Sequence, residues 1–434
     1  MDAYKIDGGF ALRGSVEISG SKNASLPCLF ASLLTPEPVR IRRLPVLRDT
    51  NTALSLLKTL GKEAFKGGDV VCLEEKNFSR AVFREITAPY DLVKQMRASI
   101  LSAGPMLARW GKARVSLPGG CAIGLRPIDI HLDGFKAMGA KISVHGGDLE
   151  LTAPKTGLKA ARYRLHFESV GATENLMMAA AFCPGVSVLE RAAREPEITD
   201  LASMLQNMGA MIEGAGTSRI VIRGNKNLRG TDHAVIADRI ETGTFVLFAA
   251  SAPGSSLEIT GCVPEHNRAL LDACRKAGVS VETSVQAIRV STPKGFRPRP
   301  LSIKTKVYPG FPTDIQPLWT AFMSRARGRT TVQESIFENR FLHVAELNRM
   351  GADIAVRGDR ALIRGAGTLT GAKVMAGDLR AGAGLIAAAL AAGGQSVISR
   401  IYHVDRGYEN LEGKLSALGA RIKRFVEVRY QRVA

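Results

Sequence analysis

One cysteine lies in a glycine-rich stretch, SLPGGCAIGLRPIDIH, that runs from Ser116 to His131. Three glycines within six residues surround Cys121, and this density predicts a loop instead of a helix or a core strand. Lys112, Arg114 and Arg126 are close in the sequence, and neighbouring cations stabilise a thiolate. Two interpretations stay open: a reactive thiol on a loop, or an inert small residue that fits a turn.

Six basic residues lie in short polar motifs near a predicted helix start or in a loop, not on an evenly charged helical face. They are Lys22 in SGSKNASLP, Arg97 in QMRAS, Arg126 in GLRPID, Arg340 in FENRFLH, Arg380 in GDLRAG and Arg406 in HVDRGYE. Guanidinium groups bind carboxylates and phosphates through paired hydrogen bonds. We expect anion binding from these residues, and a solvated surface position is the alternative for each.

Asp314, in YPGFPTDIQ, lies between a proline-rich turn and a predicted helix start. A carboxylate held in a cleft beside a hydroxyl can act as a general base. Capping of the helix that follows is the alternative role. Two histidines in polar motifs, His131 and His403, are interpreted as structural residues and not as metal ligands.

Several common catalytic motifs are missing from the sequence. It contains no Walker A motif, no GxGxxG fingerprint, no GxSxG elbow and no HExxH, which excludes the commonest nucleotide-binding, hydrolase and zinc-protease patterns. The six cysteines lie far apart, with no CxxC pair and no Cys/His cluster at zinc spacing. We therefore expect free thiols, no metal site and no cofactor.

Six segments share one ending, in which an amphipathic helix closes on a glycine and a β-like run follows. The glycines are Gly61, Gly139, Gly209, Gly278, Gly351 and Gly419, at intervals of 68 to 78 residues. A glycine just after a helix is typical of a left-handed cap, and β-branched residues then begin a strand. A second helix, rich in small residues, and a strand-like run precede each ending. Each unit is therefore predicted as helix, strand, helix, strand, with more strand at its ends.

The length of this repeat bears on the architecture. It is longer than the repeats of solenoid proteins, which favours a closed arrangement of six α/β units, three per domain, over an open array. The helices carrying Lys22, Thr173, Thr242, Asp314 and Arg380 begin with a polar or glycine-containing turn. Such helix N-termini suit phosphate binding where several converge on one cleft. Ordinary N-capping is the alternative for each.

Composition limits the class of protein. The 434 residues predict two or three domains, and no segment has the apolar length of a signal sequence or a membrane helix, so we expect a cytoplasmic protein. The formal net charge of +19 would suit a nucleic-acid or membrane-surface partner. However, the basic residues are spread along the chain and only 6% of residues are aromatic. An RNA-binding protein is thus the weaker hypothesis, supported by charge alone, and an anionic small substrate is the stronger one.

Eight segments in one order resemble the UDP-N-acetylglucosamine 1-carboxyvinyltransferase family, the enolpyruvyl transferases of peptidoglycan synthesis. The segments are SGSKNASLP, GGCAIGLRPIDIH, SVGATENLMMAA, DRIETGTF, YPGFPTDIQ, ENRFLHV, GDLRAG and YHVDRGYENLEGKLSALGA. The resemblance runs from about Tyr4 to Ile422. It implies a two-domain inverted α/β barrel, with one domain at 22–236 that carries a catalytic loop around 116–131. The other domain would comprise 1–21 and 237–434, and the active site would lie in the cleft between them.

The resemblance also implies the reaction. In that family the enolpyruvyl group of phosphoenolpyruvate passes to the 3-hydroxyl of UDP-N-acetylglucosamine by addition and elimination, and phosphate leaves. No cofactor, nucleic acid or membrane takes part, and the oligomeric state stays open.

By position, Cys121 matches the loop cysteine that protonates phosphoenolpyruvate or forms an adduct with it, and that the epoxide fosfomycin alkylates. Asp314 matches the carboxylate that receives the hydroxyl proton. Lys22, Arg97, Arg126, Arg340, Arg380 and Arg406 match the cationic shell, with Lys22 and Arg406 closest to the chemistry and Asp378 shaping the centre. The sugar-nucleotide contacts match Asn23, Arg126, Pro127, Ile128, Asp129, Ile130, Ser169, Gly171, Asp314 and Ile336.

Two related activities compete with this interpretation. The shikimate-pathway transferase uses the same donor and fold, but it has a GSKS-type start and no loop cysteine, where this chain has GSKN and GGCAIG. A sugar-nucleotide transferase with a different acceptor or a role in secondary metabolism stays open.

Overall fold

The computed structural model describes residues 2–76, 87–88, 92, 96–116 and 128–427. Two compact units make up the chain. We call the unit formed by Met1–Ser19 and Ala237–Ala434 the terminal unit, because it contains both chain ends. We call the unit formed by Gly20–Gly120 and Arg126–Ile236 the inserted unit.

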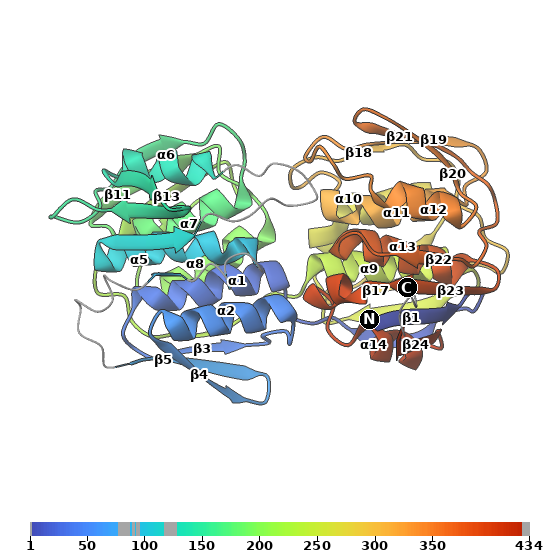
Figure 1. Ribbon diagram of the computed structural model, residues 1–434, viewed down its shortest axis with the longest axis horizontal. Coiled ribbons are helices and arrows are strands. Elements are labelled where there is room, and N and C mark those ends of the chain that lie inside the picture. Colours follow the sequence, from blue (N-terminus) through green and yellow to red (C-terminus); the bar gives the residue numbers. More distant parts are fainter. Residues whose placement is uncertain (1, 77–86, 89–91, 93–95, 117–127, 428–434) are drawn as a thin grey trace, which may run out of the picture. The chain divides into compact units, whose positions relative to one another are not determined.

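Six four-stranded sheets occur in the described residues, three in each unit, and all share one topology (Figure 1). In the order of pairing, the first two strands are parallel and the remaining neighbours are antiparallel. The sheets of the inserted unit are β14 (Asp232–Ala234), β3 (Val39–Arg42), β5 (Val70–Glu75), β4 (Lys62–Gly67); β6 (Thr87–Ala88), β7 (Lys112–Ser116), β9 (Asp148–Thr152), β8 (Lys141–His145); and β10 (Arg162–Arg164), β11 (Gly185–Glu190), β13 (Arg219–Gly224), β12 (Met211–Glu213).

The sheets of the terminal unit repeat this pattern. They are β2 (Arg13–Glu17), β15 (Ser256–Thr260), β17 (Ala287–Ser291), β16 (Ser280–Thr283); β18 (Ile303–Lys304), β19 (Arg329–Gln333), β21 (Arg360–Arg364), β20 (Asp353–Arg357); and β22 (Lys373–Met375), β23 (Gln395–Ser399), β1 (Asp2–Asp7), β24 (Arg421–Val426). Each unit has a separate hydrophobic core. The predicted fold class, with six helix-and-strand repeats in two sets of three, is confirmed.

The helices lie in the middle of each unit and the sheets lie around them (Figure 1). Those of the inserted unit are α1 (Lys22–Ala31), α2 (Arg48–Thr59), α5 (Ala103–Trp110), α6 (Asp129–Ala137), α7 (Val170–Phe182) and α8 (Pro196–Asn207). Those of the terminal unit are α9 (Arg239–Ser251), α10 (Arg268–Lys276), α11 (Gln316–Met323), α12 (His343–Arg349), α13 (Leu379–Ala391) and α14 (Leu411–Ala417). Short 3-10 helices are η1 (Ser32–Leu34), η2 (Arg97–Ser102), η3 (Pro264–Asn267), η4 (Thr313–Ile315) and η5 (Ile401–Arg406).

Composition explains which helices are central. The helices α7 and α13 consist mainly of small and apolar residues and are buried almost all round. By contrast, α10 buries one apolar stripe that includes Leu270 and Leu271 and turns its charged residues outward. None of the described helices is both long enough and apolar enough to cross a membrane.

The six glycines of the sequence repeat share one backbone conformation. Their φ angles lie between +87° and +110°, in the left-handed region, and each follows the second helix of its repeat. A residue with a Cβ is strained there, so glycine allows the chain to leave the helix and begin the next strand. This confirms the left-handed caps that the sequence predicted.

Candidate active site

Asp314 lies beside two buried arginines in the terminal unit. Its carboxylate accepts hydrogen bonds from Nη2 of Arg340 at 2.8 Å and from Nη2 of Arg380 at 3.3 Å. The side chains of Arg340 and Arg380 are 1% and 5% exposed, whereas that of Asp314 is 27% exposed. The structure therefore brings together three residues that the sequence analysis selected separately.

The alternative role of Asp314 as a helix cap is wrong. Neither η4, which contains Asp314, nor α11, which follows it, has a side-chain cap. Instead, each oxygen of the carboxylate binds a guanidinium group.

The cluster of Asp314, Arg340 and Arg380 has more positive than negative charge. In the described part of the chain, both arginines form their ion pairs with Asp314 alone. Nε of Arg340 is buried and has no hydrogen-bond partner among the described residues. Buried guanidinium groups require partners for their charge and donors, so this cluster is suited to bind an anion.

Arg380 is positioned by the start of α13. Asp378 caps this helix by accepting hydrogen bonds from two backbone N–H groups, at 2.7 Å and 3.0 Å. The guanidinium carbon of Arg380 lies 5.4 Å from the ring centroid of Tyr408. Burial lowers the pKa of Arg380, but Tyr408, Asp314 and Asp238 raise it by more, and the resulting pKa lies above the ordinary value. Arg380 therefore keeps its charge.

His343 is a buried histidine near the same cluster. It is 2% exposed, at the first position of α12. Burial lowers the pKa of His343 to about 4, with Asp378 acting to raise it and Arg340 to lower it. The ring is therefore neutral at pH 7 and adds no third positive charge beside Arg340 and Arg380.

Glu334 holds the turn that carries Asp314. Its carboxylate is buried and accepts hydrogen bonds from the hydroxyl groups of Thr305 and Thr313, both at 2.8 Å. It also accepts from the backbone N–H of Ile336 at 2.8 Å and of Phe337 at 3.2 Å. One carboxylate thus joins the residue before Asp314 to the predicted sugar-nucleotide contact Ile336.

Arg406 ends η5 and is half-buried. The preceding residue, Asp405, binds Arg424 of β24 with N–O distances of 2.6 Å and 3.1 Å. Arg424 also binds Glu412 of α14, at 2.8 Å and 3.0 Å. The turn that carries Arg406 is therefore fixed to the last strand of the terminal unit.

In the inserted unit, Lys22 and Asn23 open α1. The hydroxyl of Ser21 caps the helix by accepting from the backbone N–H of Ala24 at 3.3 Å. Lys22 is 9% exposed, and its Nζ lies 3.6 Å from Oδ2 of Asp49 in α2. The first turn of α1 contains no acidic residue, so the partial positive charge of the helix end adds to that of Lys22.

Ser169 and Gly171 lie at the start of α7. The hydroxyl of Ser169 caps the helix by accepting from the backbone N–H of Ala172 at 3.3 Å. A Cβ at Gly171 would lie 3.6 Å from Cε1 of His131, so this ring packs on the first turn. Nδ1 of His131 lies 3.1 Å from Nδ2 of Asn175, an amide nitrogen that can only donate. This contact joins His131 of α6 to Asn175 of α7.

The predicted contacts Ile128, Asp129 and Ile130 surround the start of α6. Oδ2 of Asp129 lies 3.2 Å from Nε2 of His166. Oδ1 of Asp129 is buried and has no hydrogen-bond partner among the described residues. Ile130 is buried, and Ile128 is half-buried. This helix start therefore offers an acceptor oxygen to a ligand that has an N–H or O–H group.

Four predicted site residues are not placed at the level of side chains. Cys121, Arg126 and Pro127 lie outside the described residues, so their roles stay predictions. For Arg97 the structure describes the backbone, which begins η2. The predicted loop around 116–131 is likewise described only at Ser116 and from Ile128 onward.

Three supporting residues were missed by the sequence analysis. Glu334 and Tyr408 act on the cluster around Asp314, and Asp49 pairs with Lys22. The signal for Glu334 was an acid directly after a β-like run, TTVQE, but many surface strands end this way. For Tyr408 and Asp49 no signal in the sequence indicated their partners.

A protein-family model described as EPSP synthase (3-phosphoshikimate 1-carboxyvinyltransferase) matches residues 6–415. Among curated relatives, the UDP-N-acetylglucosamine 1-carboxyvinyltransferase of Maricaulis maris (strain MCS10) is 50% identical over 424 residues, which cover 98% of this chain and 99% of the relative. The enzyme of the same name from Elusimicrobium minutum (strain Pei191) is 48% identical over 425 residues, with the same coverage.

Solved structures show the same fold. The enolpyruvyl transferase NikO from Streptomyces tendae superposes with a TM-score of 0.85 at 27% identity, over 98% of each chain. EPSP synthase from Acinetobacter baumannii superposes with a TM-score of 0.74 at 18% identity, over 98% of this chain and 100% of that one. At 18% identity the second likeness concerns the fold alone.

Proposed function

Since the chain belongs to the EPSP synthase family of carboxyvinyl transferases, we propose that it transfers the enolpyruvyl group of phosphoenolpyruvate to UDP-N-acetylglucosamine. The acceptor oxygen is the 3-hydroxyl of the sugar, and inorganic phosphate leaves. The reaction is the first committed step of peptidoglycan synthesis, and we place the protein in the cytoplasm.

The choice of acceptor rests on the relatives. The family model includes the shikimate-pathway enzyme in its name, whereas both relatives near 50% identity over the full chain carry the sugar-nucleotide name. The GSKN start and the loop cysteine in GGCAIG favour the same acceptor. Both alternatives use phosphoenolpyruvate, so the donor does not depend on this choice.

The single observation that carries the chemistry is the cluster of Asp314, Arg340 and Arg380. Phosphoenolpyruvate has a carboxylate and a phosphate, and two buried guanidinium groups with one carboxylate partner favour such an anion. The buried Nε of Arg340 provides a further donor. When the donor substrate binds, its oxygens take over hydrogen bonds that Asp314 accepts in this structure. The carboxylate of Asp314 then becomes available to a hydroxyl proton.

The proposed reaction has two stages, an addition and an elimination. In the addition, the sugar 3-hydroxyl oxygen bonds to C2 of phosphoenolpyruvate, its proton passes to Asp314, and an acid, Cys121 in our proposal, protonates the methylene carbon C3. In the elimination, the bond between C2 and the phosphate oxygen breaks and a proton from C3 returns to the Cys121 thiolate, which restores the double bond. The proton on Asp314 passes to the departing phosphate or to water, which restores both groups. Cationic residues stabilise the negative charge of the phosphate as it leaves.

We assign the sugar nucleotide to the helix starts of the inserted unit. Lys22 and the N-terminus of α1 suit a phosphate group, because both contribute positive charge. The unpaired Oδ1 of Asp129 suits an N–H or O–H donor of the nucleotide. Arg406 is assigned to the leaving phosphate, as the resemblance implies.

The test is a product assay. Purified protein with phosphoenolpyruvate and UDP-N-acetylglucosamine, each at millimolar concentration, is expected to release phosphate and to form the enolpyruvyl sugar nucleotide, identified by mass. 3-Phosphoshikimate replaces the sugar nucleotide in the control. Phosphate release with the control acceptor alone would assign the chain to the other branch of the family, and release with neither would reject the proposal.

The role of Cys121 has its own test. Fosfomycin is expected to add one equivalent of mass at Cys121, located by peptide mapping. The described cysteines provide an internal control, because Cys28, Cys183, Cys262 and Cys274 are buried. An adduct on any of these and none on Cys121 would remove Cys121 from the mechanism.

A further inference from the structure

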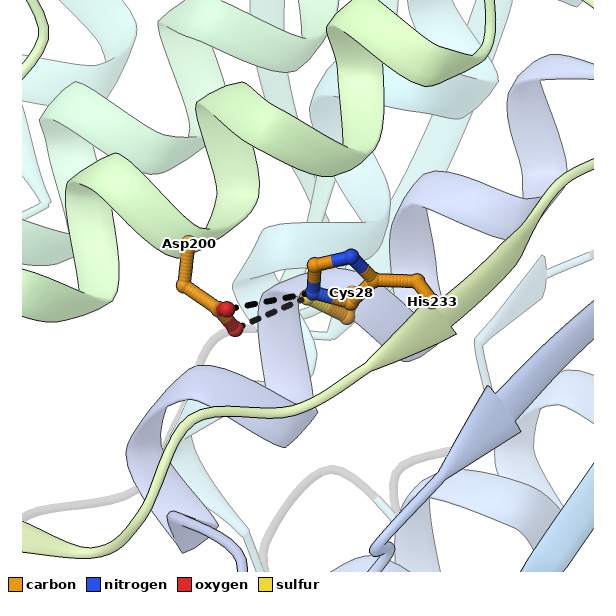
Figure 2. A group of neighbouring side chains, drawn as sticks. All are labelled: Cys28, Asp200 and His233. Carbon is orange, nitrogen blue, oxygen red and sulfur yellow. Dashed lines mark hydrogen bonds and ion pairs between the residues drawn. The ribbon is translucent and has the colours of Figure 1, made fainter. Parts of the chain in front are cut away.

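Three buried side chains from distant parts of the sequence meet in the inserted unit. Figure 2 shows Cys28 on α1, Asp200 on α8 and His233 on β14. Sγ of Cys28 lies 3.8 Å from Oδ2 of Asp200, and Nε2 of His233 lies 3.1 Å from Oδ1 of the same carboxylate. All three residues are at most 6% exposed. The proposed transfer reaction uses none of them.

One ligand atom from each of the three residues lies within 4.8 Å of the other two, which is close enough for all three to bind one ion after small adjustments. Zinc binds a thiolate at about 2.3 Å, an imidazole at about 2.05 Å and a carboxylate oxygen at about 2.1 Å. At tetrahedral angles the carboxylate oxygen then lies about 3.6 Å from the sulfur and about 3.4 Å from the nitrogen. In the structure the sulfur lies 3.8 Å from Oδ2 and the imidazole nitrogen lies 3.1 Å from Oδ1, so the Asp200 carboxylate must rotate before one of its oxygens shares an ion with both neighbours. Small side-chain rotations would therefore let all three residues bind one ion.

The charges of the three residues also suit a divalent cation. In this structure the Cys28 thiol donates to Asp200, and a bound divalent ion would displace the thiol proton, so that a thiolate and a carboxylate together would balance the two charges of the ion. One divalent ion makes the group electrically neutral, which removes the large cost of burying unpaired charge. Thiolate and imidazole ligands select zinc-type ions, whereas magnesium and calcium prefer oxygen ligands alone.

Glu174 of α7 provides an independent observation beside this group. It is 4% exposed, and its Oε1 is buried without a hydrogen-bond partner among the described residues. Burial raises the pKa of this carboxyl, and the charges of Glu197 and Glu195 raise it further. Burial, then the charge of Asp200 and then that of Glu174 raise the pKa of the Cys28 thiol, so Glu174 contributes to the electrostatic surroundings of the three residues. Glu174 does not belong to the group whose ligand atoms all lie within 4.8 Å of one another, so its carboxyl would have to move to reach the same ion.

We propose that Cys28, Asp200 and His233 form a binding site for a zinc-type divalent cation, with water at the fourth position. The ion would join α1, α8 and β14 within the inserted unit. Cys28 lies less than two helical turns after Lys22, so the same ion would hold the helix that presents Lys22 and Asn23. The competing description is a metal-free hydrogen-bonded triad, in which Asp200 accepts from both neighbours.

The first experiment measures zinc in the full-length protein. The background carries Cys121→Ser, because the predicted loop thiol could bind zinc itself. The protein is stripped with a chelator, incubated with one equivalent of zinc chloride, passed through a desalting column and assayed by mass spectrometry of the metal. We expect about one zinc ion per chain, and an affinity at least ten-fold lower after Cys28→Ala or His233→Gln. The matched control is Cys274→Ala, which removes a buried thiol of the terminal unit and should leave the zinc content unchanged.

The second experiment needs no variant at the site itself. Cobalt(II) titrated into the same stripped protein is expected to give a thiolate-to-cobalt charge-transfer band and the strong visible bands of a tetrahedral complex. Weak octahedral cobalt bands without a charge-transfer band would overturn the proposal. The proposal would also be overturned if the protein retained as much zinc after Cys28→Ala as before. Circular dichroism verifies that each variant is folded.

Discussion

At the scale of single residues, the arrangement around Asp314 links binding to catalysis. The two arginines that suit the donor anion are the same groups that hold the Asp314 carboxylate. An anion that competes for these guanidinium groups therefore changes the hydrogen bonding of Asp314 when it binds. In the proposed mechanism this would order the reaction, because Asp314 would become available as the base after the donor is in place.

Replacing Asp314 tests this role. Asp314→Asn keeps the size of the side chain but removes the proton acceptor, so kcat is expected to fall by about 10²- to 10⁴-fold. The KM for phosphoenolpyruvate should change little or fall, because the arginines lose their competing carboxylate. Steady-state phosphate release measures both constants. Asp353→Asn, at an exposed ion pair with Arg364, is the control, and a kcat for Asp314→Asn within a few-fold of that control would exclude Asp314 as the base.

His343 makes stability depend on pH. Its pKa of about 4 in the folded protein lies below the ordinary value of 6.5, so the unfolded chain binds more protons between these pH values. The free energy of unfolding is therefore lowered as the pH falls from 6.5 toward 4, by about 2 kcal/mol at pH 5 from this residue. The fall in the free energy of unfolding between pH 7 and pH 5, measured by urea denaturation, should be smaller in His343→Gln than in the parent protein. The control is His145→Gln, at an exposed histidine, in which the free energy of unfolding should fall as much as in the parent protein. An equal fall in all three proteins would contradict the prediction.

Sequence motifs selected the charged residues of the site but not their partners. Asp314, Arg340 and Arg380 were each visible because they lie in polar motifs at loops or helix starts. Their mutual contacts, and those of Glu334 and Tyr408, join residues that are far apart in the sequence. The sequence analysis did not detect the group formed by Cys28, Asp200 and His233 for the same reason. A search for metal ligands by spacing detects only residues that are close in the chain.

At the scale of elements, the fold was predicted best where glycine is required. The six glycines with positive φ marked the ends of the second helices, and the strands after them followed from the β-branched pattern. The pairing order was not fully predictable, because in two of the six sheets the first strand pairs with a strand from a distant part of the chain. An example is β14, at residues 232–234, which pairs with β3, at residues 39–42.

Replacing Glu334 tests how strongly the turn that carries Asp314 depends on this buried carboxylate. In Glu334→Gln, one acceptor oxygen becomes an NH₂ group that faces N–H or O–H donors, so the turn should shift. Because the turn positions Ile336, a predicted contact of the sugar nucleotide, we expect the KM for UDP-N-acetylglucosamine to rise. We also expect the free energy of unfolding to fall by about 1–3 kcal/mol. Glu338→Gln, exposed in the same loop, is the control for both measurements. Unchanged KM and unchanged stability in Glu334→Gln would show that the four hydrogen bonds do not position the turn.

At the scale of the whole molecule, the described residues of the inserted unit interrupt the terminal unit between Ser19 and Ala237. The backbone N–H of Asp238 donates to Ser19 at 3.0 Å in the terminal unit, and that of Ser21 donates to Ile236 at 2.7 Å in the inserted unit. The chain therefore leaves and re-enters the terminal unit at adjacent residues. The terminal unit needs both of its segments, because β1 lies between β23 and β24 and β2 pairs with β15.

Fragments of the chain should show that the terminal unit needs both of its segments to fold. Residues 20–236 alone are expected to unfold cooperatively in urea, because all the strands of their sheets lie within that segment. Residues 237–434 alone should not, because two of their three sheets lack a strand. Residues 1–19 joined to 237–434 by a short glycine–serine linker should regain cooperative unfolding. Circular dichroism measures all three, and cooperative unfolding of 237–434 alone would contradict the prediction.

The position of β1 also matters while the chain is being synthesised. Asp7 of β1 and its partner Gln395 of β23 are 388 residues apart, so at about 5–20 residues per second β1 stays unpaired for roughly 20–80 s. The inserted unit, in contrast, has all its strands before the second segment of the terminal unit is made. An unpaired strand is a site for aggregation unless charge opposes it. The two strands that wait for their partners, β1 with the sequence DAYKID and β2 with the sequence RGSVE, both contain charged residues, and we expect these charges to oppose aggregation of the unfinished chain.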